Sequence, residues 1–181
     1  MQQSYAHLKS MLWPSPSARA FAVVNGAVVP QLAERLATAD VRGWDCLWRG
    51  ALPPEKAAVA PYVAELTPDG AFTDWLLQEA STAYPGWGLV GVGPANLMAM
   101  REHGRRLIEV TLPDGDRRRW HWYDPALWAP LLPRLDPSQL DAAFGALSDW
   151  VVVGPTTWQW LTLSAGQLVV TPRDCLAASK A

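Results

Sequence analysis

Tryptophan is the residue that most constrains this chain, because eleven indole rings must be accommodated in 181 residues that hold only three phenylalanines. Indole is large and is seldom completely buried, so one core cannot hide every ring. We expect most of the tryptophans to replace phenylalanine as bulky core residues. The remainder are expected to line a surface that binds another molecule.

The composition predicts a soluble globular protein. Hydrophobic residues make up 50% of the chain and charged residues 18%, a balance that argues against disorder along most of its length. The formal net charge of -2 gives no overall attraction to nucleic acid or to anionic lipid. No stretch approaches the ~20 apolar residues of a membrane-spanning helix, and residues 1–12 lack an apolar run of signal-peptide length. We therefore expect a cytoplasmic protein with reduced cysteines and with no nucleic-acid or membrane partner.

Hydrophobic periodicity and turn residues predict both strands and helices along the chain. Strands are predicted within Ala20 to Val29, Trp44 to Trp48 and Trp87 to Val92, and in short pieces of Trp150 to Thr171. Helices are predicted after Pro30, over residues 71–81, and from Pro94 to His103, where Gly104 is the expected stop. The clearest local pattern is a β-hairpin, in which residues 106–112 and 117–123 alternate apolar and polar side chains around Pro113-Asp-Gly-Asp116. Asp124 and Asp136 are typical N-caps, each followed by proline, and predict two further helices.

These elements predict an α/β (α+β) fold with a mixed, mostly antiparallel central sheet flanked by helices. The sheet is expected to contain the strands near residues 21, 44, 87, 106, 117 and 151, with the helices of residues 125–147 as a C-terminal helical unit. Residues 1–18 are expected to form an N-terminal tail, residues 19–150 the main domain, and residues 151–181 a C-terminal β extension and tail. The sequence leaves open whether the last strands join the main sheet, and it does not determine the oligomeric state.

The catalytic and cofactor motifs in this sequence are incomplete. Gly91-Val-Gly93 lies between a strand and a helix as in a dinucleotide-binding turn, but Asn96 replaces the third glycine and Pro94 removes a backbone N–H. The three histidines have no metal-binding spacing, and no serine lies in a nucleophile-elbow motif. The sequence therefore predicts no catalytic site, no cofactor and no metal, and the glycines are interpreted as a tight turn.

Arginines are predicted to gather at the hairpin, where Arg105 and Arg106 lie across from Arg117 to Arg119. Such a basic patch is suited to an acidic protein surface or to phosphate. The alternative is a solvated strand edge that deters aggregation between sheets.

A series of segments, taken in order, resembles a known family. The segments are Phe21 to Ala27, Trp44 to Trp48, Ala60 to Leu66, Phe72 to Leu77, Trp87 to Leu89, Trp122 to Pro125, Leu131 to Pro133 and Leu135 to Leu140. They resemble the effector adaptor or chaperone family of bacterial type VI secretion systems, long catalogued as a domain of unknown function. The resemblance covers residues 20–150, and Tyr123-Asp-Pro125 after a hairpin is its most specific part, together with Ala60-Pro-Tyr62 before it. The family often has arginine where this chain has His121 and Ala126.

The resemblance implies a non-enzymatic adaptor, because members of that family hold a particular effector in the producing cell and help to load it onto the VgrG spike protein. The implied partners are a cognate secreted effector and VgrG, and residues 19–150 are the implied adaptor domain. An immunity-type protein that blocks a toxin is one alternative. Another is a small hydrolase or transferase with a dispersed site that uses His103, His121 or Asp124.

Seven residues are predicted to contact a partner: Tyr123, Asp124, Pro125, Trp128, Trp150, Trp158 and Trp160. Aromatic side chains are enriched at protein interfaces, which favours the tryptophans. Asp124 and Pro125 have a structural alternative as the N-cap and the first residue of a helix, and Tyr123 as the end of a strand.

Overall fold

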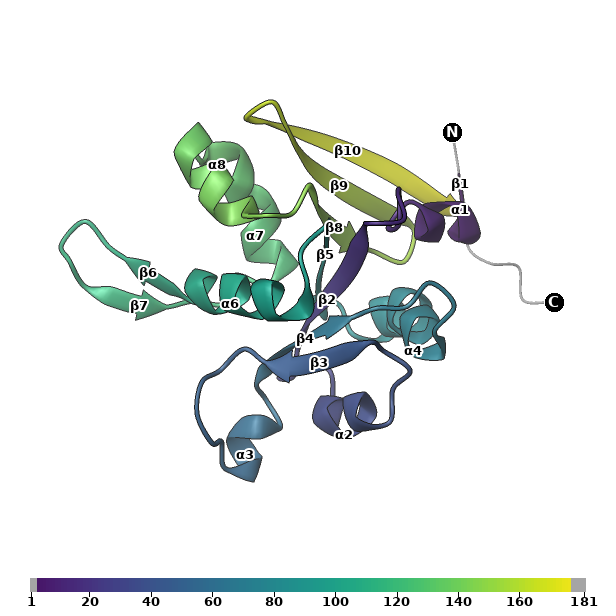
Figure 1. Ribbon diagram of the computed structural model, residues 1–181, viewed down its shortest axis with the longest axis horizontal. Coiled ribbons are helices and arrows are strands. Elements are labelled where there is room, and N and C mark those ends of the chain that lie inside the picture. Colours follow the sequence, from purple (N-terminus) through teal and green to yellow (C-terminus); the bar gives the residue numbers. More distant parts are fainter. Residues whose placement is uncertain (1–2, 177–181) are drawn as a thin grey trace.

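A large sheet with helices on both faces is the main feature of the structure (Figure 1). The computed structural model describes residues 3–176. Within these residues, eight strands form one sheet in the order β1-β10-β9-β8-β5-β2-β4-β3. Neighbouring strands are antiparallel except for β1 and β10, which are parallel. The predicted α+β class with a mixed, mostly antiparallel sheet is confirmed.

The sheet strands are β1 (Gln3–Ser4), β2 (Arg19–Asn25), β3 (Gly43–Cys46), β4 (Pro61–Glu65), β5 (Gly88–Gly93), β8 (Asp149–Val153), β9 (Thr157–Ser164) and β10 (Gln167–Leu176). A separate hairpin consists of β6 (Glu109–Thr111) and β7 (Arg117–Arg119). The helices are α1 (Tyr5–Ser10), α2 (Leu32–Ala37), α3 (Pro54–Ala57), α4 (Ala71–Asp74), the π-helical η1 (Trp75–Ala80), α5 (Ser81–Ala83), α6 (Leu97–Leu107), α7 (Pro125–Leu131), the 3-10 turn η2 (Leu132–Arg134) and α8 (Pro137–Phe144). In this described part of the chain, none of the helices has the length and apolar character needed to cross a membrane.

Alternation along the central strands divides the core into two layers. In β2, Ala20, Ala22 and Val24 face one side of the sheet, and Phe21 and Val23 face the other. The first side is covered by α1, α2 and the helical segment α4-η1, and the second by α6, α7 and α8 (Figure 1). Because both faces of β2 are buried, its sequence is an unbroken apolar run instead of an alternating one.

The N-terminal residues belong to the fold and do not form the predicted tail. β1 pairs with the end of β10, and α1 begins after the N-cap Ser4. Leu8 and Leu12 are completely buried, and the Lys9 ammonium lies 2.7 Å from the Asp74 carboxylate. The Pro/Ser stretch at residues 14–17 therefore connects α1 to β2 along the surface, because the two buried leucines anchor the segment that precedes it.

The C-terminal strands complete the main sheet, which answers the question that the sequence leaves open. β8 pairs with β5, and β9 and β10 extend the sheet as a hairpin. Ala165 and Gly166, between the paired Ser164 and Gln167, both have positive φ, as a tight two-residue hairpin turn requires. Residues 151–176 are thus continuous with the rest of the sheet. The remainder of the predicted C-terminal tail, residues 177–181, lies outside the described residues.

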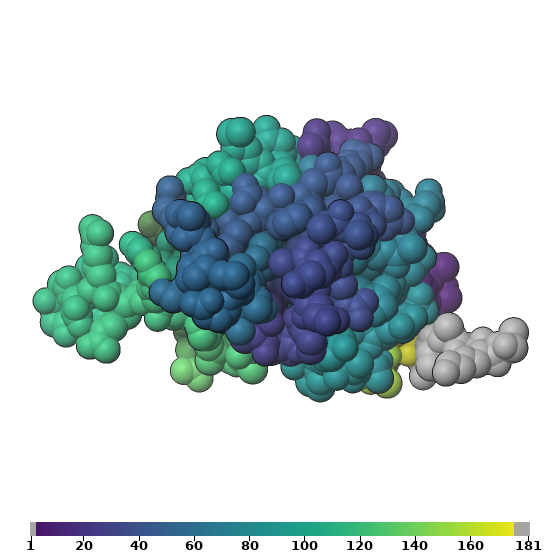
Figure 2. Space-filling model, turned by 90° about the horizontal axis from the view of Figure 1, so that it is seen from below, coloured from purple at the N-terminus to yellow at the C-terminus, as the bar shows by residue number. Residues whose placement is uncertain are grey.

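The predicted hairpin is present, but it lies outside the central sheet. β6 and β7 pair with each other and project from the body of the protein (Figures 1 and 2). Their side chains are largely exposed, and β7 consists of three arginines. Insertion of these strands into the sheet would bury charges without partners, at a large cost in free energy. The expectation that the segments near residues 106 and 117 belong to the central sheet is therefore wrong.

Helix α6 continues past Gly104, where the sequence predicts a stop. Gly104 is closely packed, because a Cβ there would lie 3.1 Å from a methyl carbon of Leu47, tighter than most Cβ contacts. The last carbonyls of α6 are satisfied from outside the helix. Trp122 Nε1 donates to the Gly104 carbonyl at 3.1 Å, and Trp120 Nε1 donates to the Leu107 carbonyl at 2.6 Å. The segment that follows the hairpin thus holds the C-terminus of α6.

The substitution Leu8→Ala tests whether the N-terminal segment is docked. Removal of a buried leucine side chain leaves a cavity and costs about 2–5 kcal/mol of unfolding free energy, so the urea midpoint should fall. Met98→Ala is the control, because Met98 is largely exposed on α6 and should change the free energy by less than about 0.5 kcal/mol. Equal effects of the two substitutions would contradict the docking.

Candidate protein-binding cleft

Three of the predicted contact residues lie together in the core, beneath α6, α7 and α8. Trp128 and Trp150 pack edge to face with their ring centroids 5.8 Å apart. Trp122 contacts both of them, at 5.3 Å and 5.2 Å, and Tyr123 packs against Trp122 at 6.1 Å. We call these four buried rings the aromatic cluster. Trp128 and Trp150 are therefore core residues in this structure, where neither ring is exposed to a partner.

Trp158 and Trp160 occupy the opposite face of the sheet. Their indoles stack with centroids 5.7 Å apart, and Tyr5 packs against Trp158 at 6.2 Å. Neither tryptophan is more than 5% exposed. The exposed aromatic surface predicted from these C-terminal tryptophans is therefore absent from the described residues. Both rings fill the core in place of phenylalanine, which is the other expectation that the composition supports.

Asp124 and Pro125 have the structural roles that their spacing also predicts. The Asp124 carboxylate accepts the Ala126 N–H at 2.9 Å, and Pro125 is the first residue of α7. The backbone carbonyl of Asp124 accepts the Trp128 N–H at 2.9 Å. The capping interpretation is confirmed, and it explains how Trp128 is held in the aromatic cluster.

A cleft of 510 Å³ opens between residues 47–59 and the base of the β6-β7 hairpin. We call it the hairpin cleft. Its apolar lining includes Leu47, Leu52, Val59, Ile108, Trp120 and Tyr123, and its cationic lining consists of Arg49, Lys56, Arg105 and Arg119. The connection between β3 and β4 supplies one wall, whereas the end of α6 and the residues around the hairpin supply the other. Segments that are far apart in the sequence therefore meet at this cleft.

Tyr123 is the predicted contact residue that lines the hairpin cleft. Its hydroxyl makes no hydrogen bond with any other residue in the described part of the chain. Burial, together with the neighbouring Asp124 carboxylate, raises the pKa of Tyr123 to about 12. The hydroxyl is thus protonated at neutral pH. The ring of His121 stacks on the tyrosine at 5.5 Å from the outside.

A network of ion pairs supports the wall formed by α6. Arg105 donates to the Cys46 carbonyl at 2.7 Å and to the Glu102 carboxylate at 3.1 Å. Arg49 lies 3.1 Å from the same carboxylate. Burial by itself would raise the pKa of Glu102, but Arg49, Arg105 and Arg101 together bring it below its usual range. The Glu102 carboxylate therefore offsets the charges of Arg49 and Arg105 and leaves Lys56 and Arg119, the other two cations of the cleft, without a partner in the described part of the chain.

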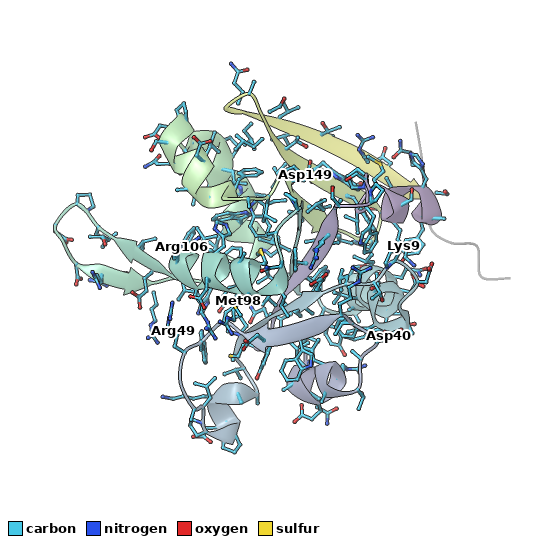
Figure 3. The ribbon with its side chains drawn as sticks, viewed as in Figure 1. Lys9, Asp40, Arg49, Met98, Arg106 and Asp149 are labelled. Atoms are coloured by element: carbon cyan, nitrogen blue, oxygen red, sulfur yellow. The ribbon has the colours of Figure 1, made fainter. Side chains whose placement is uncertain are left out.

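Positive charge dominates the rim of the hairpin cleft. Four cationic side chains line it beside one carboxylate, that of Glu109, but Arg49 and Arg105 are paired with Glu102, so Lys56 and Arg119 are the two cations left unpaired. Within the described residues, Lys56, Arg106 and Arg119 form no ion pair. Figure 3 shows Arg106 at the end of α6 that leads into the hairpin and Arg49 on the other side of that helix. The cleft therefore combines an apolar floor with unpaired cations at its edge.

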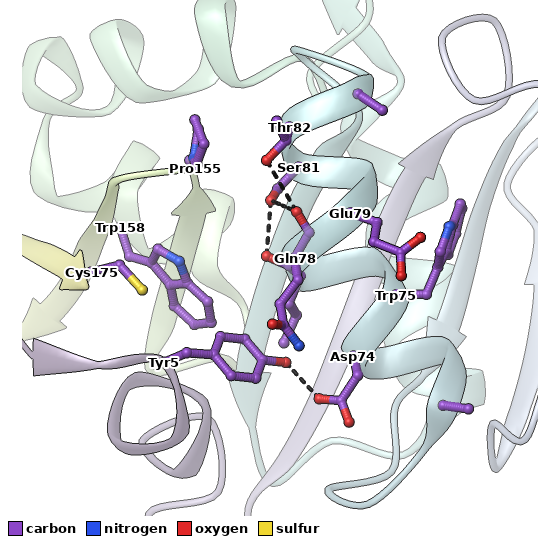
Figure 4. A pocket seen from close by; sticks show the side chains of 14 residues that line it. Tyr5, Asp74, Trp75, Gln78, Glu79, Ser81, Thr82, Pro155, Trp158 and Cys175 are labelled. Atoms are coloured by element: carbon purple, nitrogen blue, oxygen red, sulfur yellow. Dashed lines mark hydrogen bonds between the residues drawn. The ribbon is translucent and has the colours of Figure 1, made fainter. Parts of the chain in front are cut away.

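A second cleft, of 820 Å³, lies between α1, the helical residues 71–83 and the β8-β9 turn (Figure 4). We call it the Tyr5 cleft. The Tyr5 hydroxyl donates to the Asp74 carboxylate at 2.6 Å, and Lys9 donates to the same oxygen at 2.7 Å. Trp158 and Cys175 line the wall that faces the helix. The Asp74 carboxylate is thus already paired inside the protein, and the Tyr5 cleft has no excess of positive charge like that of the hairpin cleft.

The glycines between β5 and α6 are explained by packing. A Cβ at Gly93 would lie 2.7 Å from the Ala146 carbonyl oxygen, and one at Gly91 would lie 2.8 Å from a methyl carbon of Leu147. At Gly93, where the close contact is with backbone, only glycine lets the connection between α8 and β8 approach β5 this closely. The sequence predicts a tight turn here, but it does not reveal that close packing against β5 requires glycine.

The residues considered for a dispersed catalytic site have different surroundings. His103 is buried on α6, where Nε2 donates to the Ala143 carbonyl at 3.1 Å and the ring stacks on Trp150. His121 is exposed beside Tyr123, and Asp124 caps α7. Among residues 3–176, no group of three or more histidine, cysteine, aspartate and glutamate side chains is placed to hold a metal ion.

A family model matches residues 20–142, more than half of the chain, and the family is described as a domain of unknown function (DUF4123). This chain belongs to that family. No significant match was found among curated proteins or among solved structures. The hairpin cleft is built from residues 47–123 and lies entirely within the DUF4123 match, whereas the Tyr5 cleft also uses Tyr5 and residues 154–175, which lie outside it.

The sequence of this DUF4123 protein predicts part of the hairpin cleft. Arg105 and Arg119, two members of the predicted basic patch, both line it. Residues 47–59 are missing from the prediction, although they contribute Lys56 and Val59. Apart from the four-residue helix α3, that segment is irregular, so it has no periodic pattern that would indicate which side chains face a partner.

His103 is expected to make this DUF4123 protein less stable on acidification. Burial lowers the pKa of His103 below its usual range, whereas the ring keeps a pKa of about 6.5 in the unfolded chain. The unfolded state therefore binds the proton first as the pH falls. The stability of the fold that depends on a neutral His103 is complete above about pH 6.5 and is lost as the pH falls through that value. We expect His103→Gln to lose less unfolding free energy than the wild type between about pH 7 and pH 5, measured by urea titration. An identical loss in both proteins would contradict this assignment.

Proposed function

We propose that this DUF4123 protein is a non-enzymatic adaptor or chaperone that binds a specific type VI secretion effector in the cytoplasm and promotes its loading onto the VgrG spike. The observation that carries the proposal is the hairpin cleft, which offers an apolar floor and unpaired cations within the family match. The resemblance of the Ala60 to Leu66 and Trp122 to Pro125 segments to effector adaptors indicates the kind of partner. Tyr123 belongs to both the resembling segment and the cleft.

The chemistry of the cleft indicates the effector segment that it would accept. Its volume of 510 Å³ suits a few side chains, since small binding sites span about 300–1,000 Å³. Lys56 and Arg119 belong to opposite walls, so a segment with apolar side chains between carboxylates would match both the floor and the rim. Charge complementarity of this kind mainly supplies specificity and a high association rate, and burial of the apolar side chains supplies affinity.

Co-purification tests the adaptor function directly. The tagged full-length protein is isolated from the producing bacterium, and its partners are identified by mass spectrometry. We expect one toxin-like protein and a VgrG protein to be recovered together. Recovery of neither, from a bait shown to be folded, would contradict the proposal.

Charge reversal at the rim tests the cleft once the effector is purified. We expect Lys56→Glu and Arg119→Glu each to weaken effector binding about ten-fold or more, or ~1.4 kcal/mol, because each replaces attraction by repulsion. Arg134→Glu is the matched control, because Arg134 is exposed on η2 and forms no ion pair with a described residue. Isothermal titration calorimetry measures the affinities of the wild type and the three variants, and urea titration checks that the folds are intact. Equal affinities would show that the effector binds elsewhere.

Loss of the gene separates an adaptor from an immunity protein. A strain without this protein is expected to stop delivering the effector to neighbouring cells, whereas cells that express the mature toxin should survive equally well with and without it. Both readouts come from competition assays and growth curves. Protection of the toxin-expressing cells would favour the immunity function over the adaptor function.

A further inference from the structure

β10 is an edge strand whose outer side is largely unpaired. Among the described residues it pairs with β9 along residues 167–174, and with β1 through Cys175 and Leu176. Ser164 and Gln167 close the two-residue turn, and the Cys175 N–H bonds to the Thr156 carbonyl at 2.7 Å. In an antiparallel ladder, the backbone groups of successive residues point alternately toward and away from the partner strand. The turn and the Cys175 bond therefore both indicate that the backbone groups of the odd-numbered residues point toward β9. The N–H and C=O groups of Leu168 and Val170 therefore point outward.

Apolar side chains accompany these free backbone groups. Val169 is 49% exposed and Val170 is 40% exposed, on opposite faces of the same edge. An edge that combines unpaired backbone groups with exposed apolar residues is a template for another strand.

At the opposite edge of the sheet, side chains bond to the outer backbone groups and so block the addition of another strand. Half of β10 has no such protection. At β3, the Cys46 N–H bonds to the Asp45 carboxylate and the Cys46 carbonyl accepts a bond from Arg105, each at 2.7 Å. On β10, Pro172, Arg173 and Asp174 protect only the half that leads to β1, because proline lacks an N–H and the charges oppose burial. Residues 167–171 contain neither a charge nor a proline.

We propose that two copies of this chain associate through β10, with the two strands antiparallel about a two-fold axis at Val169. This register places Val169 opposite Val169 of the second copy, and Val170 opposite Leu168 of the second copy. The outward N–H and C=O groups of Leu168 and Val170 then bond to those of the second copy. The two sheets become one sheet that crosses the dimer.

The β10 edge is complementary to the β10 edge of a second copy, as a two-fold interface requires. Apolar side chains meet apolar side chains, which is a favourable cross-strand arrangement. Pro172 falls opposite Gly166 of the second copy, beyond the last bond, so its missing N–H costs no hydrogen bond. Arg173 falls opposite Ala165 of the second copy, so no like charges are brought together. A second copy of the chain is therefore the occupant that this edge fits.

The dimer leaves the hairpin clefts open. β10 lies near one end of the sheet, whereas the cleft is built on residues that follow β3 at the other end. Each dimer would thus present two clefts. The inference rests on the β10 edge alone and holds whether or not the cleft binds an effector.

Sedimentation velocity of the full chain over micromolar to sub-millimolar concentrations tests the dimer. We expect the wild type to shift from monomer to dimer, and Val169→Lys to remain monomeric, because it places two ammonium groups against each other at the axis. Leu127→Lys is the matched control, since Leu127 is also 49% exposed but lies on α7, and it should dimerise like the wild type.

A second variant keeps the test decisive if Val169→Lys fails to fold. Val170→Pro removes an outward N–H without removing a bond to β9, so it should also stay monomeric while the unfolding transition is retained. Hydrogen exchange should show slower exchange of the Leu168 and Val170 amides at high concentration in the wild type. A wild type that stays monomeric throughout, or a folded Val170→Pro that dimerises as strongly as the wild type, would overturn the proposal.

Discussion

The packing of Trp122 against Trp128 and Trp150 is the interaction on which the rest of this structure depends. It joins the segment after the hairpin to α7 and to β8. The same rings hold backbone carbonyls of two more helices, because Trp122 Nε1 bonds to Gly104 of α6 and Trp150 Nε1 bonds to Ala143 of α8. Since Tyr123 follows Trp122 directly, the burial of the tryptophan also places the tyrosine in the wall of the hairpin cleft.

The aromatic residues and the charged residues therefore have separate tasks. The indoles of the aromatic cluster and of Trp158 and Trp160 stabilise the two layers of the core. The proposed recognition of an effector falls instead to a concave site with an apolar floor that includes Tyr123 and with cations from two walls. The proposed dimer uses the opposite end of the sheet, so folding, partner binding and self-association involve different surfaces of one small protein.

Local chemistry allowed several elements to be predicted. Asp124 caps α7 and Asp136 forms a capping box with Gln139, because a cap needs only neighbouring residues. No strand was predicted at β4, which begins with Pro61, although proline is tolerated as the first residue of a strand. The hairpin was predicted correctly but placed in the wrong sheet, because strand partners are not encoded in the alternation of one segment.

The sequence by itself determined the α+β class, the helix caps, the turns and the family resemblance, all of which depend on residues close together in the chain. Only the tertiary structure decided which tryptophans are buried, that residues 3–12 dock, and that residues 47–59 meet the hairpin to form a cleft. The sequence shows that a residue is tryptophan but does not show whether its indole faces solvent or the core. Its burial depends on which helices cover the sheet, and that choice is made by the packing of the whole chain.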